Sequence, residues 1–188
     1  MREALTVQPR SAGSATIILV TGVPASGKST LSRLLADALQ LPVLSKDVVK
    51  EVLHDSLDPT DPVNISRAAA EVIWRLLPSF PRGAIVDMWL DPVRDAGVAA
   101  DGLRRAGATA RAVEIQCRCP GEVAVERYRG RLRSAAHRPP DAQTLARIQE
   151  AADTMGPAGV GPHLAVDSTN PFAIADIVAW IRHHPAGT

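Results

Sequence analysis

The sequence predicts an α/β fold with a doubly wound parallel sheet, and three observations lead to that prediction. Short apolar runs alternate along the chain with segments of helical period. Several of these runs are almost continuously apolar, as strands are when helices cover both faces of a parallel sheet. A glycine-rich loop joins the first apolar run to the first helical segment. Alternating strands and helices are typical of this fold class.

Five apolar runs are expected to form the strands. They are residues 15–21, 42–45, 84–89, 111–117 and 163–168. The first helical segment between them carries an apolar stripe of Leu31, Leu34, Leu35 and Ala38.

Three helix starts are marked by capping residues. Asp91 precedes Pro92, Asn170 precedes Pro171, and Asp141 precedes a polar segment of helical period. Because Asp and Asn cap helix N-termini and proline is favoured in the first turn, helices are expected to begin at these three places.

Length and composition favour one globular domain. The 188 residues suffice for a single core, with residues 1–14 expected as a flexible tail and residues 15–184 as the domain. The net charge of +1 gives no general attraction to nucleic acid or to membranes. No apolar run approaches the ~20 residues that would cross a bilayer.

The cysteine content points to a reducing compartment. Cys117 and Cys119 are the only cysteines, and no other Cys or His stands at ligand spacing from them. Two buried thiols are therefore expected. With neither a disulfide framework nor an export signal, the expected location is the cytoplasm.

The segment GVPASGKST, residues 22–30, predicts a loop that binds the phosphates of a nucleotide. It satisfies the pattern G-x-x-x-x-G-K-[ST] between a predicted strand and a predicted helix. Glycines allow backbone N–H groups to close around phosphate oxygens, and the helix N-terminus adds a partial positive charge. Lys28 is expected to reach the β- and γ-phosphates of ATP, and the Ser29 hydroxyl to bind Mg²⁺. The predicted nucleotide-binding residues are Gly22, Val23, Pro24, Ala25, Ser26, Gly27, Lys28, Ser29 and Thr30.

An acidic residue follows the second predicted strand, where ligands bind in open α/β sheets. Asp47 stands there in LSKDVVK, and its carboxylate could accept the proton of an attacking hydroxyl. Lys50, at i+3 on the same helical face, could hold an anionic or polar acceptor. The alternative is that Asp47 only complements the helix dipole. The residues alone leave both interpretations open.

The third predicted strand supplies a second acid. Asp87 ends an apolar run and is the candidate for the Mg²⁺ shell, at the edge where the acceptor would bind. Trp89 is expected in the core, with stacking on a substrate as the alternative. Asp91 is expected to cap a helix.

Five arginines crowd the segment GEVAVERYRGRLRSAAHRPPD. They are Arg127, Arg129, Arg131, Arg133 and Arg138. Because arginine binds phosphoryl oxygens through two N–H groups and can neutralise transition-state charge, residues 127–141 are expected to form a lid over the phosphates. The alternative is a solvated charged face. His137 is expected on the lid surface.

Taken together, the segments ILVTGVPASGKSTLSRLLADAL, LSKDVVKEVL, AIVDMWL, EIQCRCPGEVAVERYRGR and VDSTNPFAIADIVAWIR resemble the small P-loop kinases. This group includes AAA-type ATPase relatives, the kinase domain of polynucleotide kinase, chloramphenicol phosphotransferase and zeta toxin. The resemblance covers roughly residues 15–182. It implies a five-stranded parallel sheet in the order 2-3-1-4-5 and transfer of the ATP γ-phosphate to a hydroxyl.

The resemblance also implies roles for single residues. Asp47 takes the position of the general base, and Arg131 that of the lid arginine that contacts the transferred phosphate, with Arg127 and Arg133 as neighbours. Lys50 stands where polynucleotide kinases have an arginine that contacts the acceptor. The loop after the fifth strand, DSTNP, borders the adenine, whereas residues 54–64 match no known pattern.

The expected function is therefore phosphoryl transfer from ATP, with Mg²⁺, to a small hydroxylated molecule such as an antibiotic, a sugar or a nucleoside-like compound. One rival is a 5′-hydroxyl polynucleotide kinase, against which stand the near-neutral charge and the aromatic content of 3%. The other rival is a nucleotide-driven switch ATPase that has no acceptor.

Overall fold

A computed structural model describes residues 15–57, 62–91, 95, 97–107, 111–131 and 134–184. The expected N-terminal tail, residues 1–14, lies outside the described residues, as do Arg133 and part of the segment 54–64.

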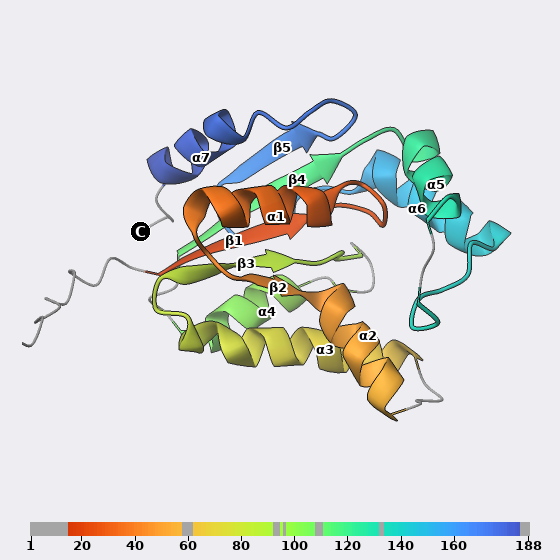
Figure 1. The fold of residues 1–188 in the computed structure, drawn as a ribbon, viewed down its shortest axis with the longest axis horizontal. Coiled ribbons are helices and arrows are strands. Elements are labelled where there is room, and N and C mark those ends of the chain that lie inside the picture. Colours follow the sequence, from red (N-terminus) through yellow and green to blue (C-terminus); the bar gives the residue numbers. More distant parts are fainter. Residues whose placement is uncertain are drawn as a thin grey trace, which may run out of the picture.

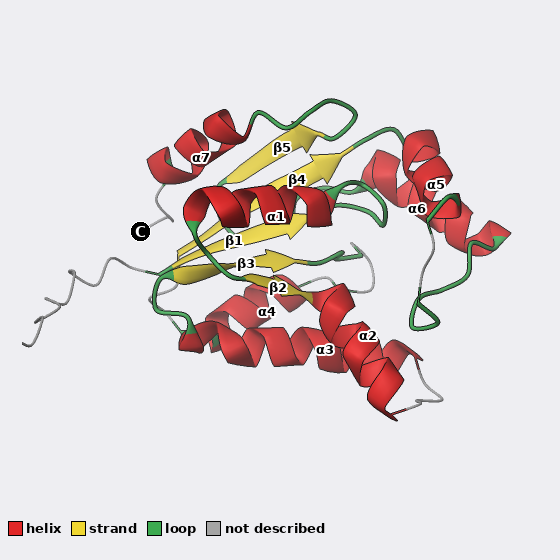
Figure 2. Cartoon of the chain, viewed as in Figure 1, coloured by secondary structure: helices red, strands yellow, loops and turns green. Residues whose placement is uncertain are grey.

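Five parallel strands form one sheet in the order β2-β3-β1-β4-β5 (Figure 1). Their bounds are β1 Thr16–Thr21, β2 Val43–Ser45, β3 Gly83–Asp87, β4 Arg111–Arg118 and β5 His163–Asp167. All strands run in the same direction, so their carboxyl ends share one edge of the sheet (Figure 2). Fold class and strand order are confirmed, and ligands bind at this edge in folds of this class.

Helices pack on both faces of the sheet. They are α1 Lys28–Leu39, α2 Lys46–Leu57, α3 Pro62–Leu76, α4 Val98–Arg105, α5 Gly121–Arg129, α6 Ala142–Thr154 and α7 Ile174–His183, with a short 3₁₀ turn Leu77–Ser79 after α3. Figure 1 shows α1 and α7 over one face and α3 and α4 over the other, with α5 and α6 beside the carboxyl ends of the strands. None of the helices in the described ranges is long and apolar enough to span a bilayer.

The central strand explains why the sequence shows continuous apolar runs. Ile17 and Leu19 of β1 pack in the cluster that includes α3, whereas Ile18 and Val20 pack on the opposite face with α1 and α7. Because successive side chains of a strand point to opposite faces, both sets must be apolar when helices cover both.

Of the three expected helix starts, one is wrong, one is confirmed, and the one after Asp91 falls on residues 92–94 and 96, which lie outside the described residues. The wrong one is at Asn170, because α7 begins four residues further on, at Ile174. The Asn170 side chain instead donates a hydrogen bond to Asp167 (2.9 Å). The third start is confirmed, because the Asp141 carboxylate accepts a hydrogen bond from the Thr144 backbone N–H at 2.7 Å.

Candidate functional site

The loop between β1 and α1 has the backbone of an anion cradle. Gly22 and Gly27 adopt φ values of 136° and 97°, and Ala25 adopts a left-handed φ of 64°. A Cβ atom on Gly22 would lie 2.5 Å from the Cys117 carbonyl oxygen, so only glycine fits there. The turn delivers the chain into the N-terminus of α1, where backbone N–H groups point toward a ligand and favour negative charge.

Lys28 opens α1 and lies inside this loop. Its side chain is only 7% exposed, and Nζ donates a hydrogen bond to the Val23 carbonyl oxygen at 2.8 Å. The ammonium group is therefore held against the cradle rather than extended into solvent. This is the place from which a lysine reaches the terminal phosphates of a nucleotide.

Asp87 lies at the carboxyl end of β3, beside the loop, and is 4% exposed. Burial raises the pKa of its carboxyl group, while the charge of Lys28 and a hydrogen bond with the Ser29 side chain act in the opposite direction. The charge of Asp47 raises the same pKa and that of Arg131 lowers it. Asp87 thus interacts with all four of these residues, which come from three separate segments of the sequence.

The donor set at this point fits a magnesium ion. The Ser29 hydroxyl lies near enough to the Asp87 carboxylate to lower its pKa, so two hard oxygen ligands lie close together beside the phosphate loop. Mg²⁺ prefers such oxygen donors and is usually held by one or two of them together with substrate phosphates.

Asp47 lies in the first turn of α2, directly after β2. Its side chain is exposed, and together with Lys28 it lines a cavity of about 400 Å³ next to the phosphate loop. Lys50, one turn further along α2, lines the same cavity. A molecule bound there would meet the Asp47 carboxylate and the side of the phosphate loop at the same time.

Trp89 forms part of the cavity wall rather than being fully enclosed. It is partly buried, packs against the cluster formed by α5 and α6, and lines the cavity. The guanidinium carbon of Arg147 lies 5.5 Å from the centroid of its ring, within cation–π range. The packing of Trp89 agrees with the expectation that it belongs to the core. Because Trp89 also lines the cavity, the alternative that it stacks on a substrate stays a prediction.

Asp91 is buried and forms an ion pair. Its side chain is 7% exposed, and its carboxylate accepts hydrogen bonds from the Arg147 guanidinium, through Nε at 3.0 Å and through the second nitrogen Nη2. The ion pair joins the end of the β3 segment to α6 across the cavity wall. A buried carboxylate needs a charged partner, and the partner of Asp91 is 56 residues away in the sequence.

Basic side chains of the lid segment, residues 127–141, lie on two sides of the site. Arg127 donates hydrogen bonds to the backbone carbonyl of Ser168 (3.0 Å) and to its hydroxyl (3.4 Å). Ser168 lies against Gly27 of the phosphate loop. The contacts with Ser168 therefore hold Arg127 close to that loop. Arg131 is exposed and near enough to influence Asp87.

The second half of the lid segment lies over α2. His137 Nε2 is 2.7 Å from the Glu51 carboxylate, and the Tyr128 hydroxyl donates to the Arg138 carbonyl oxygen at 2.9 Å. These contacts bring the lid segment to the rim of the cavity opposite the phosphate loop.

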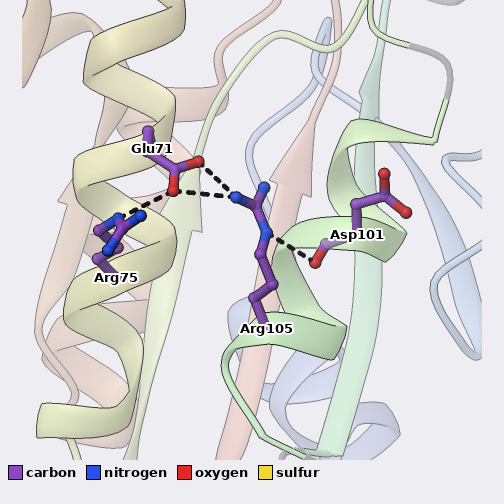
Figure 3. A network of polar contacts seen from close by, with 4 residues as sticks. All are labelled: Glu71, Arg75, Asp101 and Arg105. Carbon is purple, nitrogen blue, oxygen red and sulfur yellow. Dashed lines mark hydrogen bonds and ion pairs between the residues drawn. The ribbon is translucent and has the colours of Figure 1, made fainter.

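An ion-pair network closes the far end of the cavity, between α3 and α4 (Figure 3). Arg105 donates from Nη1 to both Glu71 carboxylate oxygens, at 2.9 and 2.8 Å, and Arg75 donates to one of them at 3.0 Å. Although desolvation acts to raise the pKa of Glu71, the two arginine hydrogen bonds hold it below its ordinary value. The network fixes the spacing of the two helices.

Several residues of the cavity wall were not predicted from the sequence as site residues. They are Arg67 and Trp74 of α3, Arg105 of α4 and Arg147 of α6. No local motif marks them, because the packing of helices distant in sequence brings them together. The two cysteines behave as expected: both are free and buried, and burial raises the pKa of Cys117 to about 12.

Fold and site together define the class. A five-stranded parallel sheet in this order, with a glycine-rich loop leading into α1, is a P-loop NTPase fold of the kind found in small kinases. A family model described as AAA domain matches residues 17–155, and the chain belongs to that family. Membership implies a nucleotide-binding protein. No curated protein sequence matches the chain.

Solved structures with the same fold include several kinases. One from Chloroflexus aurantiacus J-10-fl, provisionally described as a kinase, is 28% identical with a TM-score of 0.75, over 92% of this chain and 99% of that one. A gluconokinase from Sinorhizobium meliloti 1021 is 20% identical (TM-score 0.55, 89% of each chain). A shikimate kinase from Acinetobacter baumannii, in complex with shikimate, is 17% identical (TM-score 0.56, 90% of this chain and 92% of that one). The last two are similar in fold alone.

Proposed function

We propose that the protein is an ATP-dependent kinase that transfers the γ-phosphate to a hydroxyl group of a small molecule. The observation that carries this proposal is the convergence on Asp87 of Lys28, Ser29, Asp47 and Arg131. A phosphate-binding lysine, an oxygen ligand for Mg²⁺, a second carboxylate and a mobile cation are the parts that phosphoryl transfer requires. Kinases among the structural neighbours support the same reaction class.

Each of these residues has one task in the reaction. The loop backbone and Lys28 bind and orient the β- and γ-phosphates. Ser29 and Asp87 hold Mg²⁺, which neutralises phosphate charge when bound. Arg131 stabilises the charge on the phosphoryl group as it moves.

Asp47 serves as the base. The acceptor oxygen attacks the γ-phosphorus, the bond from that phosphorus to the β–γ bridging oxygen breaks, and ADP leaves with this oxygen. The proton of the hydroxyl passes to the Asp47 carboxylate. The exposure of Asp47 toward the cavity supports this role, because a base must touch the acceptor and not the metal.

The cavity favours a small acceptor over a nucleic acid. Its volume of about 400 Å³ falls in the range of small-molecule sites. The aromatic content of 3% leaves few platforms on which the bases of a single-stranded nucleic acid could stack.

ADP release measured with and without acceptors tests the proposal. Purified protein with ATP and Mg²⁺ is assayed alone, with a panel of hydroxyl compounds, and with a 5′-hydroxyl oligonucleotide. The proposal predicts ADP release that depends on a small acceptor. Rapid release with no acceptor would favour the switch ATPase, and release with only the oligonucleotide would favour a polynucleotide kinase.

A further inference from the structure

The cavity beside Asp47 is far more basic than the protein as a whole. Seven basic side chains and three acidic ones line it, in a chain whose net charge is only +1. The basic ones are Lys28, Lys46, Lys50, Arg67, Arg105, Arg138 and Arg147, and the acidic ones are Asp47, Glu71 and Asp95. Positive charge is therefore concentrated at the proposed acceptor site.

Part of this charge is balanced by the protein itself. Arg105 pairs with Glu71, and Arg147 pairs with the buried Asp91. Lys28 belongs to the phosphate loop, where the nucleotide requires it. The other basic side chains of the wall are Lys46 and Lys50 on α2, Arg67 on α3 and Arg138 in the segment 127–141.

Three of them line the same cavity from three different elements. Lys50 lies one helical turn from Asp47, about 5 Å along the axis of α2. Arg67 projects from α3, which packs directly against α2 (Figure 1). Arg138 follows His137, whose ring contacts Glu51, the neighbour of Lys50. Three different elements thus contribute cations to the cavity that Asp47 also lines.

The rest of the wall is apolar or donates hydrogen bonds. Leu90 and Val98 line the cavity beside the ring of Trp74, which is 2% exposed. The indole N–H of Trp74 is buried and has no hydrogen-bond partner among the described residues. Ammonium and guanidinium groups of the wall can donate to a ligand, and the ligand atoms that suit them are the oxygens of an anion.

We propose that the phosphoryl acceptor is an organic anion, whose carboxylate or phosphate group binds Lys50 and Arg67 about one helical turn from the hydroxyl that Asp47 deprotonates. Arg138 completes the anion site from the lid segment, and the apolar wall holds the body of the molecule. This inference rests on the proposed kinase function and adds the class of its acceptor.

Matched pairs of acceptors test the inference. Gluconate is compared with glucitol, shikimate with its methyl ester, and glycerol 3-phosphate with glycerol. Two quantities are measured for each compound: kcat/KM for acceptor-dependent ADP release, and the rise in Tm in the presence of Mg²⁺ and ADP, which reports binding without turnover. At least one anion is expected to exceed its neutral partner by roughly 10- to 100-fold, the effect of losing a charged hydrogen bond. The first two pairs report a carboxylate and the third a phosphate.

Substitutions at Arg67 locate the anion site. Arg67→Met is expected to lower the preference for the anion about tenfold, and Arg67→Lys to restore most of it. Arg182→Met is the control, since Arg182 is an exposed arginine on α7 that does not line the cavity. Because Arg67 is also exposed, neither substitution is expected to change the Tm of the unliganded protein.

The outcomes separate this inference from the kinase proposal. If neutral compounds react as well as their anionic partners, the inference is overturned and the kinase stands. If anions raise the Tm through Arg67 without releasing ADP, the anion site stands and the kinase proposal falls. If no anion in the panel binds at millimolar concentration, or if Arg67→Met leaves the preference unchanged, the inference is wrong.

Discussion

Gly102 lies inside α4 against the indole ring of Trp74, and its replacement by alanine tests how the cavity wall is packed. A Cβ atom at this position would lie 2.3, 2.5 and 2.7 Å from Cδ2, Cε2 and Cγ of Trp74. Ordinary carbon–carbon contacts are about 3.5–4.0 Å long. Either α4 or the indole must therefore move by about 1 Å, although both belong to the buried core.

The size and the sign of the effect follow from these distances. Helix propensity alone predicts that Gly102→Ala stabilises the protein by about 1 kcal/mol. Overpacking costs about 1–3 kcal/mol, and an overlap with three ring atoms belongs at the upper end of that range. The expected net loss is about 2 kcal/mol. In a domain of this size it lowers Tm by about 4–8 °C.

Thermal unfolding followed by circular dichroism measures this loss. Gly156→Ala is the matched control, because a Cβ atom at Gly156 meets no other atom within 4 Å, and its Tm should be equal to or slightly above that of the wild type. Since Trp74 lines the cavity, Gly102→Ala should also raise KM for the acceptor more than KM for ATP. An unchanged or higher Tm for Gly102→Ala would refute the packing of α4 on Trp74.

Three further changes test other parts of the account. Lys28→Ala should abolish turnover in a folded protein, because Lys28 is the cation held within the phosphate loop, and full activity would contradict the assignment. Arg131→Ala should lower kcat by ~10²-fold or more with little change in ATP affinity. Arg129→Ala, on the same segment, is the control and should leave kcat unchanged. Equal effects of the two substitutions would mean that the arginines form only a solvated charged face. Asp141→Ala should destabilise the protein at neutral pH, because hydrogen bonds from Thr144 lower the pKa of the Asp141 carboxyl below its ordinary value. A lowered carboxyl pKa stabilises the fold above the unfolded-state pKa, so the difference in Tm should shrink as the pH falls below ~4, and a difference that grows in acid would refute it.

The sequence predicted the sheet because the relevant signals are local. The Gly22–Lys28 pattern and the alternation of β1 side chains between two covered faces need no knowledge of distant contacts. Burial within a helix was harder to predict. Leu31 and Leu35 are fully buried, yet Leu34 of the same stripe is 40% exposed, because the face that α1 buries is narrower than its apolar pattern.

The candidate site was predictable only where a residue follows a strand. Asp47 and Asp87 stand at strand ends, and parallel strands bring such positions to one edge. The ion pair of Asp91 was not predictable, because Arg147, its partner, lies on α6, 56 residues away. Arg67 and Trp74 were missed for a related reason, since a lone arginine or tryptophan on an amphipathic helix gives no sign of which neighbour it will face.

The measurement that tests the central claim most directly is kcat for acceptor-dependent phosphoryl transfer by Asp47→Asn, taken together with its Tm and its affinity for ATP. The amide keeps the size of the side chain but cannot take the proton, so kcat should fall by about 10²- to 10⁴-fold with folding and ATP binding retained. Asp176→Asn is the control, because Asp176 also lies in the first turn of a helix, away from the cavity, and it should leave kcat unchanged. If Asp47→Asn transfers phosphate at nearly the wild-type rate, Asp47 is only a helix-terminal charge and is not the base.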